Sequence, residues 1–351
     1  MAAPRAFLPL WFGFLLMESF VSSFNQQLRH AAEIGAAAEL TALAAWPRPH
    51  HVVVAGVGGS GIGGDIVRGI VLDRLPVPLC VVRTYSVPAF VGPDTLFIAS
   101  SFSGDTEETL AAVDAAQAAG ARIVAITSGG GLLQRAQAHG WPTVRIPGES
   151  KLPRANVGYS LVQLLFVLRA AGLLTADFTA ELHATVALLE AEQERIQREA
   201  RDLAHLLTNH LPVIYADARL EAVALRFRQQ LNENANQLAL VNTFSEMNHN
   251  EIVGWENPAA VLSRTAVVLL RTPVDHPRVR VRMELCAPVF AAHAASLTTI
   301  DALGDSPLAQ ALYLIQLLDW ASVFTARLNG ADPLTVPAID ELKARLAERG
   351  A

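Results

Sequence analysis

Short apolar runs rich in β-branched residues alternate with helical segments from residue 51 onward, and this alternation constrains the fold more than any other feature. Strands that are separated by helices need crossover connections, which give parallel sheets covered by helices on both faces. We therefore predict an α/β fold with parallel sheets flanked by helices. The expected strands lie at residues 51–57, 78–85, 95–102, 122–128, 211–217, 266–272 and 296–302.

The order of strands and helices in the first half is repeated in the second half. A chain of 351 residues with 52% hydrophobic content has room for two domains of about 100–200 residues each. The long apolar helix expected at 151–174 has a counterpart at 306–328, and a charged amphipathic helix at 180–207 joins the halves. We predict an N-terminal extension and helix (1–49) and two doubly wound domains (50–187 and 188–351).

Composition excludes several classes of function. The net charge is −6, the isoelectric point is near 5.9, and no run of Lys or Arg is present, so we expect no nucleic-acid partner. Cys80 and Cys286 lie in apolar runs of different halves, which favours buried hydrophobic side chains over a disulfide. None of the ten histidines has metal-ligand spacing, so no metal is expected.

The first sixteen residues contain one Arg and then an apolar run of about eleven residues, which is too short to span a bilayer and has the length of a signal-peptide core. One hypothesis is that Met17 is the natural start and that residues 1–16 come from an upstream start. The alternative is a signal or anchor, although no A-x-A cleavage pattern follows the run. We favour the first hypothesis and expect no membrane partner.

The stretch VVVAGVGGSGIGGDIV, residues 52–67, predicts a buried strand, a glycine-rich turn and the start of a helix. Residues 56–61 fit the dinucleotide pattern G-x-G-x-x-G. That pattern requires an acidic residue after the next strand, where this chain has Arg83 instead. Free N–H groups and the Ser60 hydroxyl at a helix N-terminus suit a single phosphate as well. A nucleotide-dependent oxidoreductase therefore remains a weaker alternative.

A second polar loop follows the strand expected at 95–102. A helix is predicted to begin near Asp105, with Glu108 helping to cap it. Two adjacent strands that both end in Gly/Ser loops, at the carboxyl edge of a parallel sheet, favour a ligand site there. The loop holds Ser100, Ser101, Ser103 and Thr106.

The motifs GVGGSGIGGD and SSFSGDTEET resemble the sugar isomerase (SIS) domain, a doubly wound fold that binds phosphosugars. Further motifs, VVRTYSVP, PRANVGYSLVQLL, LNENAN, EMNHNEIVGW and GADPLTVPAIDELKARL, resemble the bifunctional phosphoglucose/phosphomannose isomerases from about residue 17 to the C-terminus. The resemblance implies two SIS domains in a homodimeric, cytoplasmic enzyme without a cofactor. Such an enzyme interconverts glucose 6-phosphate, and mannose 6-phosphate, with fructose 6-phosphate through a cis-enediol.

Interconversion of an aldose and a ketose phosphate needs a base, an acid/base pair that opens the ring and a group that stabilises the enediolate. By the resemblance, Glu233 is the base, and His249, contributed by the other subunit, opens the ring. Arg154 would face the enediolate, and Lys343 would assist at the ring oxygen. The residues that would bind substrate, chiefly its phosphate, are Gly59, Ser60, Ser101, Ser103 and Thr106.

The motif around the expected base departs from the family at one position. Asn236 stands where the family usually has a basic residue, so an ion pair with Glu233 from that position is not expected. Glu251 and Trp255 are interpreted as structural. A different class of function stays open on the residues alone, a phosphosugar-sensing SIS module without catalysis, although no output domain is visible in the sequence.

Overall fold

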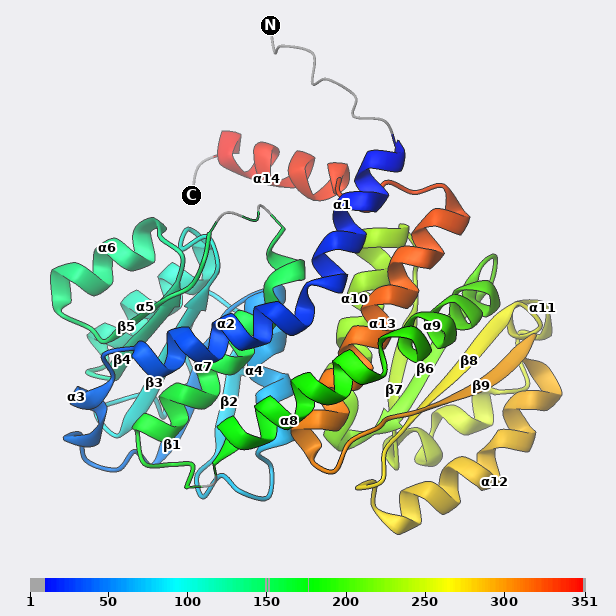
Figure 1. Ribbon diagram of the computed structural model, residues 1–351, viewed down its shortest axis with the longest axis horizontal. Coiled ribbons are helices and arrows are strands. Elements are labelled where there is room, and N and C mark those ends of the chain that lie inside the picture. Colours follow the sequence, from blue (N-terminus) through cyan, green and yellow to red (C-terminus); the bar gives the residue numbers. More distant parts are fainter. Residues whose placement is uncertain (1–9, 149, 151, 176, 350–351) are drawn as a thin grey trace, which may run out of the picture.

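The computed structural model describes residues 10–148, 150, 152–175 and 177–349, and contains two parallel sheets (Figure 1). The first sheet has the order β2-β1-β3-β4-β5 and the second has the order β7-β6-β8-β9. This confirms the predicted fold class. The strands of the first sheet are β1 (His51–Ala55), β2 (Leu79–Val82), β3 (Thr95–Ser101), β4 (Arg122–Thr127) and β5 (Thr143–Arg145). Those of the second are β6 (Leu211–Asp217), β7 (Leu240–Phe244), β8 (Thr265–Arg271) and β9 (Ser296–Asp301).

Helices cover both faces of the first sheet, because its strands are apolar on both sides. Successive residues of a strand point to opposite faces: Val54 of β1 belongs to the central core, and Val53 belongs to a separate core on the outer face. The outer helices are α5 (Glu107–Ala118) and α6 (Gly130–His139), seen at the left of Figure 1. The inner helices are α4 (Gly59–Ile70) and α7 (Val157–Ala170), and α7 follows the short helix η1 (Pro153–Asn156).

The second sheet is covered in the same way. Its outer face packs on α12 (Pro277–His293), where Tyr215 stacks on Phe290 with ring centroids 5.1 Å apart. Its inner face packs on α10 (Glu221–Ala235) and α13 (Pro307–Asn329). Short elements complete this half of the chain: η2 (Ala218–Leu220), η3 (Glu246–His249), η4 (Glu251–Gly254) and α11 (Ala259–Leu262).

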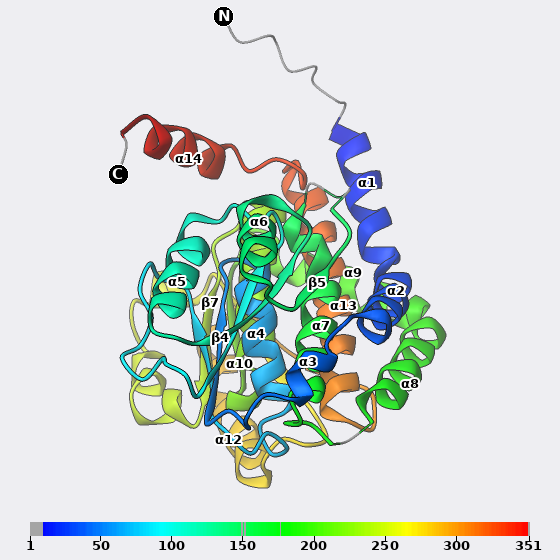
Figure 2. The same cartoon turned by 90° about the vertical axis from the view of Figure 1, so that its left-hand side faces the viewer.

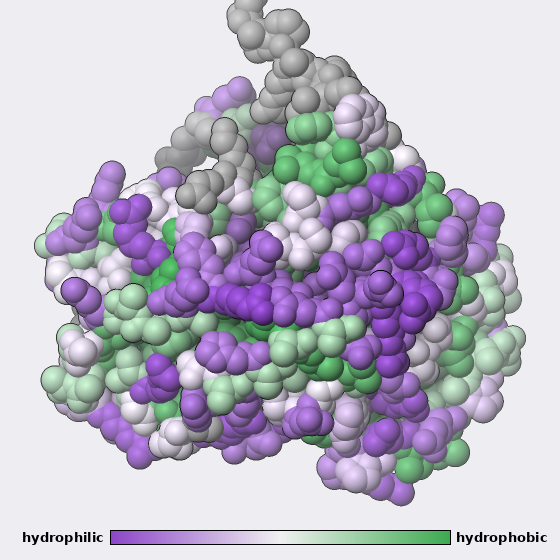
Figure 3. All heavy atoms as spheres, in the orientation of Figure 1, coloured by the Kyte–Doolittle hydropathy of each residue, from purple (hydrophilic) through white to green (hydrophobic). Residues whose placement is uncertain are grey.

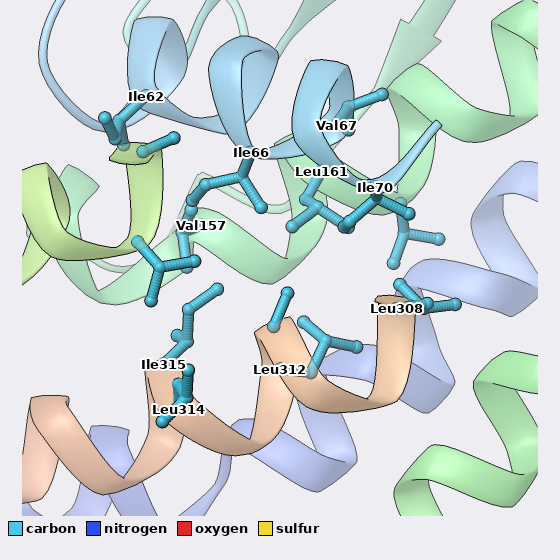
Figure 4. Close-up of a cluster of buried hydrophobic side chains, with 14 of the residues drawn as sticks. Ile62, Ile66, Val67, Ile70, Val157, Leu161, Leu308, Leu312, Leu314 and Ile315 are labelled. Carbon is cyan, nitrogen blue, oxygen red and sulfur yellow. The ribbon is translucent and has the colours of Figure 1, made fainter. Parts of the chain in front are cut away.

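A continuous hydrophobic core joins the two sheets through the helices between them. Figure 4 shows Ile62, Ile66 and Ile70 of α4 facing Leu312 and Ile315 of α13. The four-residue spacing on α4 keeps its three isoleucines on one face of the helix. Among the described helices, α13 is the one that is long and apolar enough to cross a membrane, but nearly all of it is buried in this core.

Three local features differ from the sequence prediction. The edge strands β5 and β7 were not expected, and the helix predicted over 180–207 is two helices, α8 (Phe178–Ala191) and α9 (Gln193–Leu207). The N-cap residue of α5 is Thr106, so the helix begins later than predicted. The Asp105 carboxylate accepts a hydrogen bond from Gly131 N at 2.8 Å, which links two neighbouring loops instead of capping the helix.

The N-terminal helices lie across the molecule, and α14 (Pro337–Arg349) lies above the first sheet (Figures 1 and 2). They are α1 (Leu10–Ser22), α2 (Phe24–Ala37) and the short α3 (Thr41–Ala44). Phe14 is buried against Ala235 and Ala326, whereas Trp11 is 63% exposed. Figure 3 shows a hydrophobic patch where α1 lies. Part of the segment before Met17 therefore packs on the body of the molecule, and residues 1–9 lie outside the described residues.

Replacement of Phe14 should measure what this segment contributes to stability. Phe14→Ala removes a buried ring, so we expect the free energy of unfolding to fall by about 2–4 kcal/mol. Trp11→Ala on the same helix is the matched control and should change it by less than about 0.5 kcal/mol. Denaturant unfolding of both variants, and of a chain that starts at Met17, provides the measurement. Equal stability of Phe14→Ala and the parent protein would show that the packing of α1 is dispensable.

Candidate active site

The glycine-rich turn between β1 and α4 packs closely against the end of β3. A side chain at Gly56 would put its Cβ 2.7 Å from the Ser100 carbonyl oxygen, and Gly58 has a φ of 58°, a value that favours glycine. The turn ends at the N-terminus of α4, where the first backbone N–H groups of a helix have no partner within the helix. This end of α4 is therefore suited to an anion.

The loop between β3 and α5 is held by its own hydroxyl groups. Ser101 is buried, and its Oγ accepts a hydrogen bond from Gly104 N at 3.1 Å and lies 2.9 Å from Thr106 Oγ1. Ser103 is exposed, and its Oγ accepts from Asp105 N at 3.2 Å. The loop thus presents Ser103 and the N-terminus of α5 to solvent, on a turn fixed by Ser101.

The two loops are joined at the carboxyl edge of the first sheet. Phe102 N donates a hydrogen bond to Ser60 Oγ at 3.2 Å, so the first turn of α4 contacts the loop that leads into α5. Two helix N-termini and several hydroxyls therefore meet at one edge. These residues are the ones predicted to bind the substrate phosphate, and we call the set the phosphate cup: Gly59, Ser60, Ser101, Ser103 and Thr106.

Arg154 lies directly beside the phosphate cup. A Cβ added at Gly59 would lie 3.7 Å from Arg154 Cα, which shows how closely η1 approaches the turn. The Arg154 side chain is only 6% exposed, and its Nη1 donates to Glu233 Oε2 at 3.3 Å. Burial lowers the pKa of the Arg154 guanidinium, and the charges of Glu233 and Asp332 oppose this shift. The result is a buried cation at the edge of the cup.

Glu233 occupies the last turn of α10, and its side chain is 31% exposed. Its carboxylate is therefore in contact with Arg154 on one side and accessible on another. The structure brings together the cup, Arg154 and Glu233, which lie far apart in the sequence. The arrangement places a carboxylate and a cation next to an anion site, as proton transfer on a phosphorylated substrate requires.

His249 lies away from this group within one chain. Glu233 is at the C-terminal end of α10, which connects the parallel strands β6 and β7, and His249 is in η3, beyond the other end of β7. A five-residue strand extends about 16 Å. Among the described residues, no hydrogen bond or ion pair joins His249 to the cup, and its side chain is exposed.

The loop that carries His249 is firmly anchored. Trp255 is buried, and its Nε1 donates to Tyr215 Oη at 3.0 Å, while Tyr215 Oη donates to the Glu251 carboxylate. Asn242 of β7 also donates to Glu251. Burial raises the pKa of Tyr215 above its ordinary value, which keeps the hydroxyl a donor. Glu251 and Trp255 thus have the structural contacts expected of them, and they hold His249 in place at the surface.

Lys343 is exposed on α14. In the part of the chain that the structure describes, no hydrogen bond or ion pair links it to Arg154 or Glu233. The segment before α14 does reach the site, since Arg154 Nη2 donates to the Pro333 carbonyl oxygen at 2.6 Å. Asn236 takes the left-handed conformation that ends α10, with a φ of 50°, a backbone geometry that asparagine tolerates well.

A large cavity lies elsewhere, at the carboxyl edge of the second sheet. Its volume is about 670 Å³, and none of the predicted site residues lines it. Several of its charged side chains already have partners: Asp65 pairs with Arg83 and Arg68, and Arg219 pairs with Asp73. We therefore assign the site to the contacts around Arg154 and not to this cavity.

Sequence reasoning missed a buried polar network beneath Arg154. Asn234 Oδ1 accepts from Arg154 Nε at 2.8 Å, and Arg226 donates to the Arg154 carbonyl oxygen at 3.0 Å. The sequence does contain a signal for this network. Polar residues recur at every fourth position of α10 and so share one face of the helix: Arg226, Gln230 and Asn234. The sequence did not reveal that this face is buried.

Comparison with known proteins identifies the family. The chain is 39% identical over 339 residues to the bifunctional phosphoglucose/phosphomannose isomerase of Caldicellulosiruptor bescii, a match that covers 94% of this chain and 99% of that protein. The protein of the same name from Aquifex aeolicus is 33% identical over 84% of this chain and 90% of its own. The chain belongs to the bifunctional phosphoglucose/phosphomannose isomerase family. This confirms the resemblance inferred from the motifs and favours an enzyme over a non-catalytic sensing module.

Other matches agree with this family. Residues 196–346 match the model of the bacterial phospho-glucose isomerase C-terminal SIS domain. A hypothetical protein from Thermus thermophilus has the same fold, with a TM-score of 0.74 at 18% identity over 97% of this chain and 94% of that chain. Tagatose-6-phosphate ketose/aldose isomerase from Escherichia coli has a TM-score of 0.70 at 16% identity, covering 91% and 96% of the two chains.

Proposed function

We propose that this protein interconverts glucose 6-phosphate and mannose 6-phosphate with fructose 6-phosphate, by acid/base catalysis and without a metal or cofactor. The contact between Arg154 and Glu233 at the edge of the phosphate cup carries this proposal, since it joins a base to a cation beside an anion site. The names of the relatives from Caldicellulosiruptor bescii and Aquifex aeolicus support the choice of sugars.

The proposed reaction starts with ring opening and proceeds through proton transfer. His249 and Lys343 act on the ring oxygen and the anomeric hydroxyl to give the open-chain aldose. Glu233 then removes the proton from C2, and the carbonyl oxygen at C1 takes up the negative charge as the cis-enediolate forms. Arg154 stabilises this charge, which develops only as the transition state is approached. The hydroxyl proton then passes from O2 to O1, Glu233 returns its proton to C1, and the carbonyl that forms at C2 gives fructose 6-phosphate.

We further propose a homodimer in which His249 of one subunit completes the site of the other. Within one chain, Glu233 and His249 lie beyond opposite ends of β7. His249 is exposed on a loop anchored by Glu251 and Trp255, as a residue that acts on a neighbouring subunit requires. The cytoplasm is the proposed compartment, because these sugar phosphates are intracellular.

Assays with each sugar phosphate separately test the proposed activity. Formation of fructose 6-phosphate from both glucose 6-phosphate and mannose 6-phosphate, in the presence of EDTA, is the expected result. Turnover of neither sugar, with phosphosugar binding still measurable by calorimetry, would instead support a sensing module.

The phosphate cup predicts a specific binding defect. Ser101→Ala together with Ser103→Ala removes two hydroxyls and the turn contacts that they make. We expect KM for glucose 6-phosphate to rise by roughly 10–100-fold, since hydrogen bonds to a charged group are each worth about 1.5–3 kcal/mol. Weak binding of unphosphorylated glucose should not change. Loss of affinity for both sugars to the same extent would argue against a phosphate site.

A further inference from the structure

A buried polar network of α10 and α13 holds Arg154 in place. The proposed function depends on the position of the Arg154 guanidinium. Asn234 is fully buried, and its amide bridges two groups: Oδ1 accepts from Arg154 Nε at 2.8 Å, and Nδ2 donates to Ser322 Oγ at 2.9 Å. Ser322 Oγ in turn donates to the Asp319 carbonyl oxygen at 2.7 Å. Because each side of the amide has a partner of the right kind, its orientation is fixed.

The backbone of Arg154 is held by the same pair of helices. Arg226 of α10 donates to the Arg154 carbonyl oxygen at 3.0 Å and to Asp319 Oδ2 of α13 at 2.6 Å. Gln230 donates to the other oxygen of Asp319 at 3.1 Å. Burial raises the pKa of Asp319, and the nearby Arg226 charge opposes this. The Arg154 carbonyl group therefore has little freedom to move without breaking these buried hydrogen bonds.

Asn234 is next to Glu233 in the chain, and both side chains contact the same guanidinium. Arg154 uses Nε toward Asn234, Nη1 toward Glu233 and Nη2 toward the Pro333 carbonyl oxygen. The Nε contact, at 2.8 Å, is shorter than the contact with Glu233, at 3.3 Å. It also lies deeper than the contact with Glu233, since Asn234 is fully buried and the Glu233 side chain is 31% exposed.

We propose that Asn234 is a positioning residue, which fixes the Arg154 guanidinium relative to Glu233 so that the cation meets the charge of the enediolate. It would act through Arg154 and would not touch the substrate. This inference rests on the proposed function, because Arg154 matters for catalysis only if enediolate chemistry occurs. The phosphate cup lies on other elements and does not depend on Asn234.

The test compares two asparagines that connect the same helices. Asn234→Ala removes the acceptor for Arg154 Nε, and we expect kcat for glucose 6-phosphate to fall by roughly 10–100-fold, as for lost supporting contacts in other sites. KM should stay within about threefold, because the cup is intact. The matched control is Asn329→Ala. Asn329 Nδ2 donates to the Ala235 carbonyl oxygen at 3.1 Å and so joins α13 to the end of α10 without contacting Arg154.

Rescue by a conservative variant separates positioning from stability. Asn234→Asp keeps an oxygen for Arg154 Nε, so its kcat should exceed that of Asn234→Ala by about tenfold. Asn234→Ser keeps a hydroxyl near Ser322, but the serine side chain is too short to reach Arg154. This variant takes the place of Asn234→Ala if the alanine variant is insoluble. Melting temperatures are recorded for all variants.

Three results would overturn the proposal: an unchanged kcat in Asn234→Ala, an equal loss of kcat in Asn329→Ala, or no rescue by Asn234→Asp. Wild-type turnover is measured first. Absence of turnover in the wild type would contradict the proposed function itself and is thereby distinguished from failure of the positioning role.

Discussion

Glu233→Gln is expected to lower kcat by roughly 10²–10⁴-fold, the range for loss of a general base. The amide oxygen of Gln can still accept the hydrogen bond from Arg154 Nη1, so the geometry of the site should persist while the proton acceptor is lost. Binding of glucose 6-phosphate, measured by calorimetry, should therefore remain within about threefold of the wild type.

Glu221→Gln is the control for this experiment, because Glu221 is an exposed residue at the opposite end of the same helix. Its kcat should match that of the wild type. If Glu233→Gln keeps full turnover, the base must be a different residue, and the Arg154–Glu233 contact would be structural.

The second large effect concerns His249 and the dimer. His249→Ala alone should lower kcat by roughly 10²-fold or more, since ring opening loses its acid/base group. Co-expression of Glu233→Gln and His249→Ala subunits with different affinity tags allows the mixed dimer to be isolated. If each site combines Glu233 of one subunit with His249 of the other, one of the two sites is intact, and about half of the wild-type activity should return.

A converse pairing makes the result decisive. In a dimer of a wild-type subunit and a subunit carrying both Glu233→Gln and His249→Ala, each site holds one altered residue, so we expect almost no activity. Sites built within single subunits predict the opposite for both mixtures: no recovery in the first and about half activity in the second. Such an outcome would require His249 to reach Glu233 within one chain.

Much of the fold could be predicted because the apolar runs differ so clearly from the helical segments. The edge strand β7 escaped prediction because its sequence, LVNTF, carries two polar residues and only its last residue is buried. The break between α8 and α9 falls at Glu192, without a Gly or Pro to mark it. The loops of the phosphate cup were predicted correctly as neighbours, since the carboxyl ends of adjacent parallel strands must meet at one edge.

The contact between Arg154 and Glu233 could not be derived from the spacing of residues in the sequence. Arg154 and Glu233 are 79 positions apart, and only the packing of η1 on α10 brings them into contact. The family resemblance predicted that both residues belong to one active site, but neither the resemblance nor the pattern of residues predicted their contact. The role of Asn234 was not foreseen, because a polar residue on an amphipathic helix is usually exposed, and only the structure shows that this face meets α13.

Isotope exchange shows whether the chain transfers a proton through an enediol. Fructose 6-phosphate is incubated with the full chain in D₂O, and the aldose products are analysed by NMR. A proton held by Glu233 can exchange with solvent before it is returned, so we expect deuterium at C2 of glucose 6-phosphate and mannose 6-phosphate after repeated turnover. Aldose products that carry no deuterium at C2 after many cycles of the reversible reaction would contradict this mechanism, because a direct hydride shift between C1 and C2 exchanges no hydrogen with solvent.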